Sequence, residues 1–147
     1  AFAKITLFFC AGAIYVATHK KEISQMSGLG RAMPFTFGAF ALAALSMIGA
    51  PPVGGFISKW YLVLGALDAG SLGILFVLLA STLLNAAYFV PVVYSAFFGK
   101  APAGDEAHHY GEAPLAMLVP LSLTALISVL IGFYPDFFMD FAKGVLP

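Results

Sequence analysis

Long apolar runs alternate with short polar stretches along this chain. The runs cover residues 1–18, 34–67, 71–98 and 113–134, and each carries at most one charged side chain. A helix that crosses the hydrocarbon of a bilayer needs about 20 mostly apolar residues. The pattern therefore predicts an all-α fold, a polytopic transmembrane helix bundle with about four spanning helices.

The second run is too long for one straight helix and contains its own interruption. Pro51 and Pro52 lack backbone N–H donors and clash with the preceding turn, and Gly54 and Gly55 let the freed backbone bend. Non-helical backbone at membrane depth occurs only inside protein or beside water, and discontinuous helices mark ion sites in transporters. We therefore predict a helix break at Pro51 and Pro52, with a simple proline kink as the alternative.

The last residues, 136–146, have a different pattern. On a helix, Asp136, Asp140 and Lys143 fall on one face, opposite the phenylalanines. Such a segment is too short to span, so it predicts an amphipathic helix on the membrane surface. An ordinary packed terminal helix is the alternative.

Composition supports a membrane protein. Of 147 residues, 61% are hydrophobic and 10% are charged, whereas charged residues make up about 25% of a soluble domain. The 7 basic and 7 acidic residues cancel, so nucleic acid is not an expected partner. Because Ala1 falls inside an apolar run, we expect residues 1–147 to be the C-terminal part of a larger subunit.

The positive-inside rule predicts the orientation. With four crossings, the polar connectors 19–33 and 99–112 share one side and hold Lys20, Lys21, Arg31 and Lys100, whereas Lys143 is alone on the other side. The connectors are therefore expected in the cytoplasm and the C-terminus outside. Residues 34–67 folded as a hairpin would instead place the C-terminus inside.

Two lysines are expected at membrane depth, Lys59 within its own run and Lys4 if the first helix continues upstream of Ala1. Lys59 is roughly 12 Å along a helix from the end of its apolar run, and Lys4 is roughly 21 Å from the nearest polar connector. A lysine at the centre of a spanning helix costs about 2.5–3.5 kcal/mol and usually marks an ion or proton path. Desolvation favours the neutral amine and a nearby carboxylate favours the ammonium, so a balanced lysine can exchange a proton. A lysine that anchors its helix or pairs permanently with an acid is the alternative.

Polar side chains near these lysines are candidates for the same path. Ser58 follows the predicted break directly, and Ser81, Asn85 and Tyr88 form a polar stripe on the third run. They could organise water or equally bond to neighbouring helices. The sequence has no nucleotide-binding, nucleophile or convincing metal-ligand pattern, so we expect no cofactor, no metal and no enzyme active site.

Three ordered motifs, residues 1–9 (AFAKITLFF), 26–34 (MSGLGRAMP) and 49–60 (GAPPVGGFISKW), resemble the proton-translocating antiporter-like membrane subunits. That family includes subunits of respiratory complex I, of membrane-bound hydrogenases and of the Mrp-type Na⁺/H⁺ antiporter. Residues 58–62 (SKWYL) and 83–94 (LLNAAYFVPVVY) are most similar to the D-type subunit of the Mrp antiporter.

The resemblance implies that this chain supplies the last four of about fourteen helices. It implies that Lys59 matches the lysine of the family's broken twelfth helix and that Lys4 matches the lysine of the eleventh. The implied function is proton conduction along buried lysines and water in a cell (inner) membrane complex. The implied partners are other membrane subunits, the missing N-terminal part, lipid, protons and, in an antiporter, Na⁺. A complex I or hydrogenase subunit and a non-pumping membrane anchor are the alternatives.

The predicted orientation can be tested with a reporter fused after Pro147. A reporter that is active only outside the cytoplasm should give signal, because the charge bias puts the C-terminus there. Signal only from a cytoplasmic reporter would support the hairpin alternative instead.

Overall fold

A computed structural model describes residues 1–51, 53–100 and 111–144, and in these ranges the chain is helical with short connections. The elements are α1 (Phe2–Thr18), the 3-10 helix η1 (Ile23–Met26), α2 (Leu29–Ala32), α3 (Pro34–Ile48), α4 (Gly54–Asp68), α5 (Leu72–Phe98), α6 (Leu115–Phe133) and α7 (Pro135–Lys143). The all-α prediction is confirmed for the described residues.

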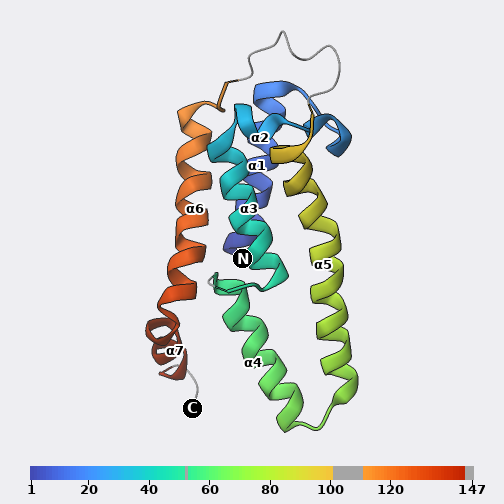
Figure 1. The fold of residues 1–147 in the computed structure, drawn as a ribbon. Helices are drawn as coiled ribbons and strands as arrows, with labels where there is room; N and C mark the ends of the chain where they lie inside the picture. Colours follow the sequence, from blue (N-terminus) through green and yellow to red (C-terminus); the bar gives the residue numbers. More distant parts are fainter. Residues whose placement is uncertain (52, 101–110, 145–147) are drawn as a thin grey trace.

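The helices form an elongated bundle in which α3 and α4 follow one another along the same direction (Figure 1). Helix α1 packs against α3 and α6, and α5 packs against α3 and α4. The connector after α1, the last turn of α5 and the first turn of α6 lie at one end of the bundle, and the turn between α4 and α5 lies at the other (Figure 1). Residues 34–67 therefore cross the bundle once, and the hairpin alternative is wrong.

Helix length explains why the second crossing needs both halves. Helices α5 and α6 contain 27 and 19 residues and are long and apolar enough to cross a bilayer. Helices α3 and α4 contain 15 residues each, which is about 22 Å of rise. Neither half reaches across about 30 Å of hydrocarbon, so the break lies at depth.

The core lies where α1, α3 and α6 meet. Small and medium side chains, among them Cys10, Ala13, Ile14 and Leu121, surround the large ring of Phe37, and each of these five residues is at most 1% exposed. In a membrane no hydrophobic effect drives helices together, so they associate by close van der Waals packing. Small residues at the contact allow the helix backbones to approach closely enough for this packing.

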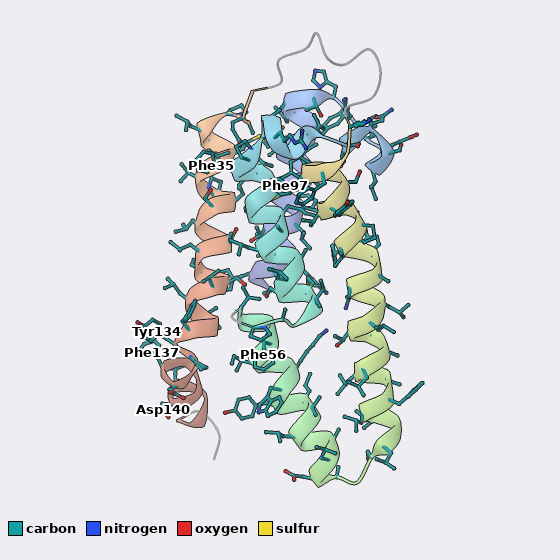
Figure 2. All side chains as sticks on the ribbon, in the orientation of Figure 1. Phe35, Phe56, Phe97, Tyr134, Phe137 and Asp140 are labelled. Atoms are coloured by element: carbon teal, nitrogen blue, oxygen red, sulfur yellow. The ribbon has the colours of Figure 1, made fainter. Side chains whose placement is uncertain are left out.

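Helix α5 joins this core mainly through one end. Phe97 lies between α5 and α3 (Figure 2), and its ring meets Phe37 edge-on with 6.4 Å between centroids. By contrast, Phe89 and Ala96 are the only buried residues of α5, which the structure describes along its full length. The outer faces of this helix are therefore free to contact lipid or other helices.

Side chains from distant parts of the sequence hold the connector end together. The guanidinium Nε of Arg31 donates to the Phe97 carbonyl at 2.9 Å, and the Ser27 hydroxyl donates to the Lys100 carbonyl at 2.9 Å. Since the last turn of a helix leaves carbonyls without intrahelical partners, the bond from Arg31 satisfies the end of α5, and the bond from Ser27 holds the residues that follow it.

Glu112 performs the equivalent task for α3. One carboxylate oxygen accepts from the Phe35 backbone N–H at 2.6 Å, and the other accepts from the Thr36 hydroxyl at 2.8 Å. A carboxylate at a helix N-terminus satisfies an orphan N–H and complements the helix dipole. The residue that caps α3 is thus supplied by the segment before α6.

The C-terminal helix α7 begins at Pro135, directly after α6. Figure 2 shows Tyr134, Phe137 and Asp140 at this end of the chain, and Phe137 and Phe141 are 73% and 76% exposed. Aromatic side chains that the bundle leaves this exposed favour the interfacial interpretation over a packed terminal helix. Residues 145–147, with the end of the predicted segment, lie outside the described residues.

The interruption between α3 and α4 depends on two glycines. Gly49 ends α3 with φ of 85°, a conformation that side chains disfavour. At Gly55 an added Cβ would collide with the Ser46 carbonyl group, so only glycine lets the first turn of α4 lie against the last turn of α3. Pro51 is exposed at the break, and Pro52 lies outside the described residues.

The close approach at Gly55 gives a stability prediction. Gly55→Ala should lower the free energy of unfolding by about 1–3 kcal/mol, because the backbone of α3 or α4 has to move. Gly65→Ala is the matched control, since a Cβ there meets nothing within 4 Å and alanine favours helix by about 0.5–1 kcal/mol. Thermal unfolding of the full-length subunit in detergent measures both, and equal midpoints for the two variants would contradict the packing role of Gly55.

Candidate functional site

Lys59 occupies the second turn of α4 and reaches back toward the end of α3. Its stem passes over Gly49, where an added Cβ would lie 2.5 Å from Lys59 Cδ. Its Nζ donates to the Ile48 carbonyl at 2.8 Å and to the Thr82 hydroxyl oxygen at 2.9 Å. The break thus places the amine between three helices, α3, α4 and α5.

The end of α3 is a suitable acceptor for this amine. Ile48 is the last residue of α3, and the carbonyls of a last helical turn have no intrahelical partner. The C-terminal end of a helix also carries partial negative charge, which stabilises a cation. The interrupted helix therefore supplies an acceptor that an unbroken helix would have used for itself.

The second acceptor comes from α5. The Thr82 hydroxyl donates to the Leu78 carbonyl at 3.0 Å, so its lone pairs are left for Lys59. Both acceptors of Lys59 are neutral. Moreover, the sequences of α3, α5 and α6 contain no acidic or basic side chain, so within these described helices dipoles alone offset the charge of the ammonium.

A second polar group lies at the same break, against α6. Ser128 donates to the Ser46 hydroxyl at 3.2 Å, and the backbone N–H of Gly55 donates to the same oxygen at 3.2 Å. These serines, together with Ser58, line a cavity of about 190 Å³ that Gly54, Gly55 and the start of α1 also border. The cavity is roomy and polar enough for water.

Several residues singled out in the sequence lie away from Lys59. Lys4 is exposed on the first turn of α1. Asn85 lines a shallow depression formed by α5 residues alone, and Tyr88 is 60% exposed with its ring against Phe89, 4.7 Å between centroids. Within the described ranges the structure thus brings Ser58 and Lys59 to the break, leaves Lys4 and Tyr88 exposed, and leaves Asn85 half-buried on α5 without placing it against Lys59.

The sequence pattern did not single out Thr82, because Thr82 lies beside the polar stripe of Ser81, Asn85 and Tyr88 and not within it. A signal for it was present in the spacing. Lys59 lies eleven residues before Gly70 and Thr82 lies eleven residues after Ser71 (70 − 59 and 82 − 71), and Gly70 and Ser71 form the turn between α4 and α5. Residues equidistant from the turn of an antiparallel helical hairpin lie at the same height.

Comparison with known proteins finds relatives across nearly the whole chain. Residues 1–100 match the family described as "NADH:quinone oxidoreductase/Mrp antiporter, TM". The chain is 40% identical over 146 residues to NADH-quinone oxidoreductase subunit N of Desulforudis audaxviator, covering 92% of this chain and 29% of that protein. It is 39% identical over 137 residues to NADH-quinone oxidoreductase subunit L of Mycobacterium tuberculosis, covering 89% and 21%.

A solved structure shares the fold. A chain of the Mrp complex from Dietzia sp. superposes with a TM-score of 0.83 at 22% identity, covering 95% of this chain and 34% of that chain. The present chain therefore spans less than a third of the length of the curated relatives named above and about a third of the matched structure.

The neutral surroundings of Lys59 give a second stability prediction. Lys59→Met keeps the length of the side chain and removes the charge, and we expect the free energy of unfolding to rise by about 1 kcal/mol. This is less than the 2.5–3.5 kcal/mol cost of a lysine at depth, because the two hydrogen bonds are lost.

Lys100→Met is the matched control, since Lys100 is exposed at the connector end, and a surface substitution should change stability by less than about 0.5 kcal/mol. Both are measured by thermal unfolding in detergent. A clear loss of stability for Lys59→Met would show that Lys59 holds the fold together.

Proposed function

The chain belongs to the NADH:quinone oxidoreductase/Mrp antiporter transmembrane family, and on that premise we propose that it is the C-terminal transmembrane part of a proton-conducting membrane subunit. One observation carries the proposal. The ammonium of Lys59 is held at a broken helix by neutral acceptors alone, the Ile48 carbonyl and the Thr82 hydroxyl. Such an intramembrane lysine is a candidate for ion or proton transfer.

In the proposed step, Lys59 receives a proton on its amine from water or a neighbouring group and later releases it toward the other side. The protonated form is stabilised by the end of α3 and by Thr82. The cost of a charge at this depth is about 2.5–3.5 kcal/mol, and one charge crossing 100 mV is worth about 2.3 kcal/mol. A change in nearby charge or in membrane potential is therefore comparable with the cost of charging the lysine and would shift its protonation.

The other residues have supporting roles in this proposal. Ser58, with Ser46 and Ser128, would hold water in the cavity beside the break. Lys4 and Tyr88 are exposed and Asn85 is half-buried, and in this proposal they would extend the proton path toward the upstream part of the subunit or a neighbouring subunit. The chain would act as transport machinery without its own active site.

The leading candidate is a subunit of a multisubunit cation/proton antiporter in the cell (inner) membrane, with its C-terminus on the outer side. The resemblance of residues 58–62 and 83–94 to the D-type subunit of the Mrp antiporter supports it, and the fold shared with the Mrp complex is consistent with it. Its partners would be the N-terminal part of the subunit, sister membrane subunits, lipid, protons and Na⁺.

A second candidate is a proton-pumping subunit of a respiratory NADH-quinone oxidoreductase or a hydrogenase. The observation that favours it is that the curated relatives described above carry the name NADH-quinone oxidoreductase subunit N or L. A non-pumping membrane anchor is disfavoured, because an anchor has no need of a costly lysine beside a broken helix. Copurification separates the first two: sister antiporter subunits favour one, and iron–sulfur or flavin proteins favour the other.

The role of Lys59 is tested in the complete complex reconstituted into proteoliposomes. We expect Lys59→Ala to lower proton flux by about tenfold or more, because a transfer barrier raised by about 1.4 kcal/mol already has that effect. Lys59→Arg should be equally defective, because arginine does not release its proton at working pH.

Lys100→Ala serves as the matched control, because it removes an exposed lysine from the connector end, and it should transport normally. Wild-type flux in Lys59→Ala would remove the basis of the proposal.

A further inference from the structure

Thr82 is the side chain through which α5 contacts the amine of Lys59. We propose that Thr82 is a positioning residue that sets the proton affinity of Lys59, by presenting a hydroxyl oxygen oriented to accept from the ammonium. The inference rests on the proposed role of Lys59 in proton transfer.

The hydrogen-bond geometry fixes the direction in which Thr82 acts. Its hydroxyl proton is used in the 3.0 Å bond to the Leu78 carbonyl one turn earlier in α5, a common arrangement for threonine in a helix. The oxygen therefore faces Lys59 with its lone pairs. A lone pair stabilises an ammonium more than a neutral amine, so Thr82 holds the proton on Lys59.

The position of Thr82 makes this bond sensitive to helix movement. Lys59 and Thr82 are on different helices, α4 and α5, which pack against each other and are connected along the chain by the short turn after Asp68. The other acceptor, the Ile48 carbonyl, is in α3, so a small separation of α5 from α4 would remove one acceptor and keep the other. Proton affinity would then fall without any change in the charge of a neighbouring residue.

On the described helices that pack around Lys59, few other side chains could set its proton affinity. Neither α3 nor α6 has a titratable side chain, α5 has Tyr88 and Tyr94, and α4 has Tyr61 and Asp68 besides Lys59. The tyrosines of α4 and α5 are each more than half exposed, and Asp68 is the last residue of α4, about 13 Å of helix from Lys59. The neutral hydroxyl of Thr82 is thus the side-chain partner of the amine.

The test is the pH profile of proton flux in the full-length subunit within its reconstituted complex. Thr82→Val keeps the shape of the side chain and removes the acceptor, so the pH of half-maximal flux should move toward acid by about one unit. Flux should recover at lower pH, where the weakened amine is protonated again. Thr82→Ser restores an acceptor and should restore the wild-type profile.

Thr124→Val is the matched control. Thr124 also makes an i−4 hydroxyl bond within its helix, to Pro120, and its partner is Thr6 of α1, so the same substitution there should leave the profile unmoved. If Thr82→Val fails to assemble, Thr82→Ala removes the same oxygen with less bulk and should give the same shift.

The outcomes separate this inference from the proposed function. A Thr82→Val profile that superimposes on wild type, or a rate lowered equally at every pH, would overturn the positioning role while Lys59→Ala still abolishes flux. Normal flux in Lys59→Ala would instead overturn the proposed function, and the role of Thr82 with it. An acid shift in Thr82→Val that Thr82→Ser reverses supports the inference.

Discussion

The bond between Lys59 and the last carbonyl of α3 is the interaction on which the rest of the site depends. A lysine at membrane depth needs acceptors, and an intact helix has none to offer because its carbonyls are already bonded. By ending α3 at Ile48, the chain frees a carbonyl and directs the negative end of a helix dipole at the amine, 2.8 Å away. The break therefore supplies the acceptor that Lys59 needs, and Lys59 satisfies the carbonyl that the break leaves without a partner.

The glycines make this arrangement possible in space. Gly49 turns the chain with a positive φ and leaves room for the stem of Lys59, and Gly55 lets α4 begin directly against Ser46. The two sides of the break then differ in chemistry. On one side are the amine, a carbonyl and the Thr82 hydroxyl, and on the other is a serine-lined cavity. The amine and the cavity thus lie on opposite sides of the same break, and Ser58, the neighbour of Lys59 in α4, borders the cavity.

Hydrogen bonds between distant segments hold the bundle together at the connector end, whereas α4 and most of α5 have exposed faces. Glu112 caps α3, and Arg31 bonds to the end of α5, so three crossings are tied together where the connectors lie. Much of α5 and the rings of Trp60 and Tyr61 in α4 remain exposed, as expected of helices that contact lipid or further helices. Helix α5 is thus anchored near Phe97 and less constrained near Thr82, where a small displacement would alter the surroundings of Lys59.

The sequence by itself determined the helical class, the broken second crossing, the connectors at one end and the place of Lys59 beside the break, because apolar run length, proline chemistry and the cost of a charge at depth are local properties. Tertiary structure alone decided which groups meet. Glu112 as the cap of α3, the Ser46–Ser128 pair and Thr82 as the partner of Lys59 join residues 76, 82 and 23 positions apart. The polar stripe predicted roles for Asn85 and Tyr88, whereas the contact of Thr82 with the lysine follows from the packing of α5 against α3 and α4, which polarity along one helix does not determine.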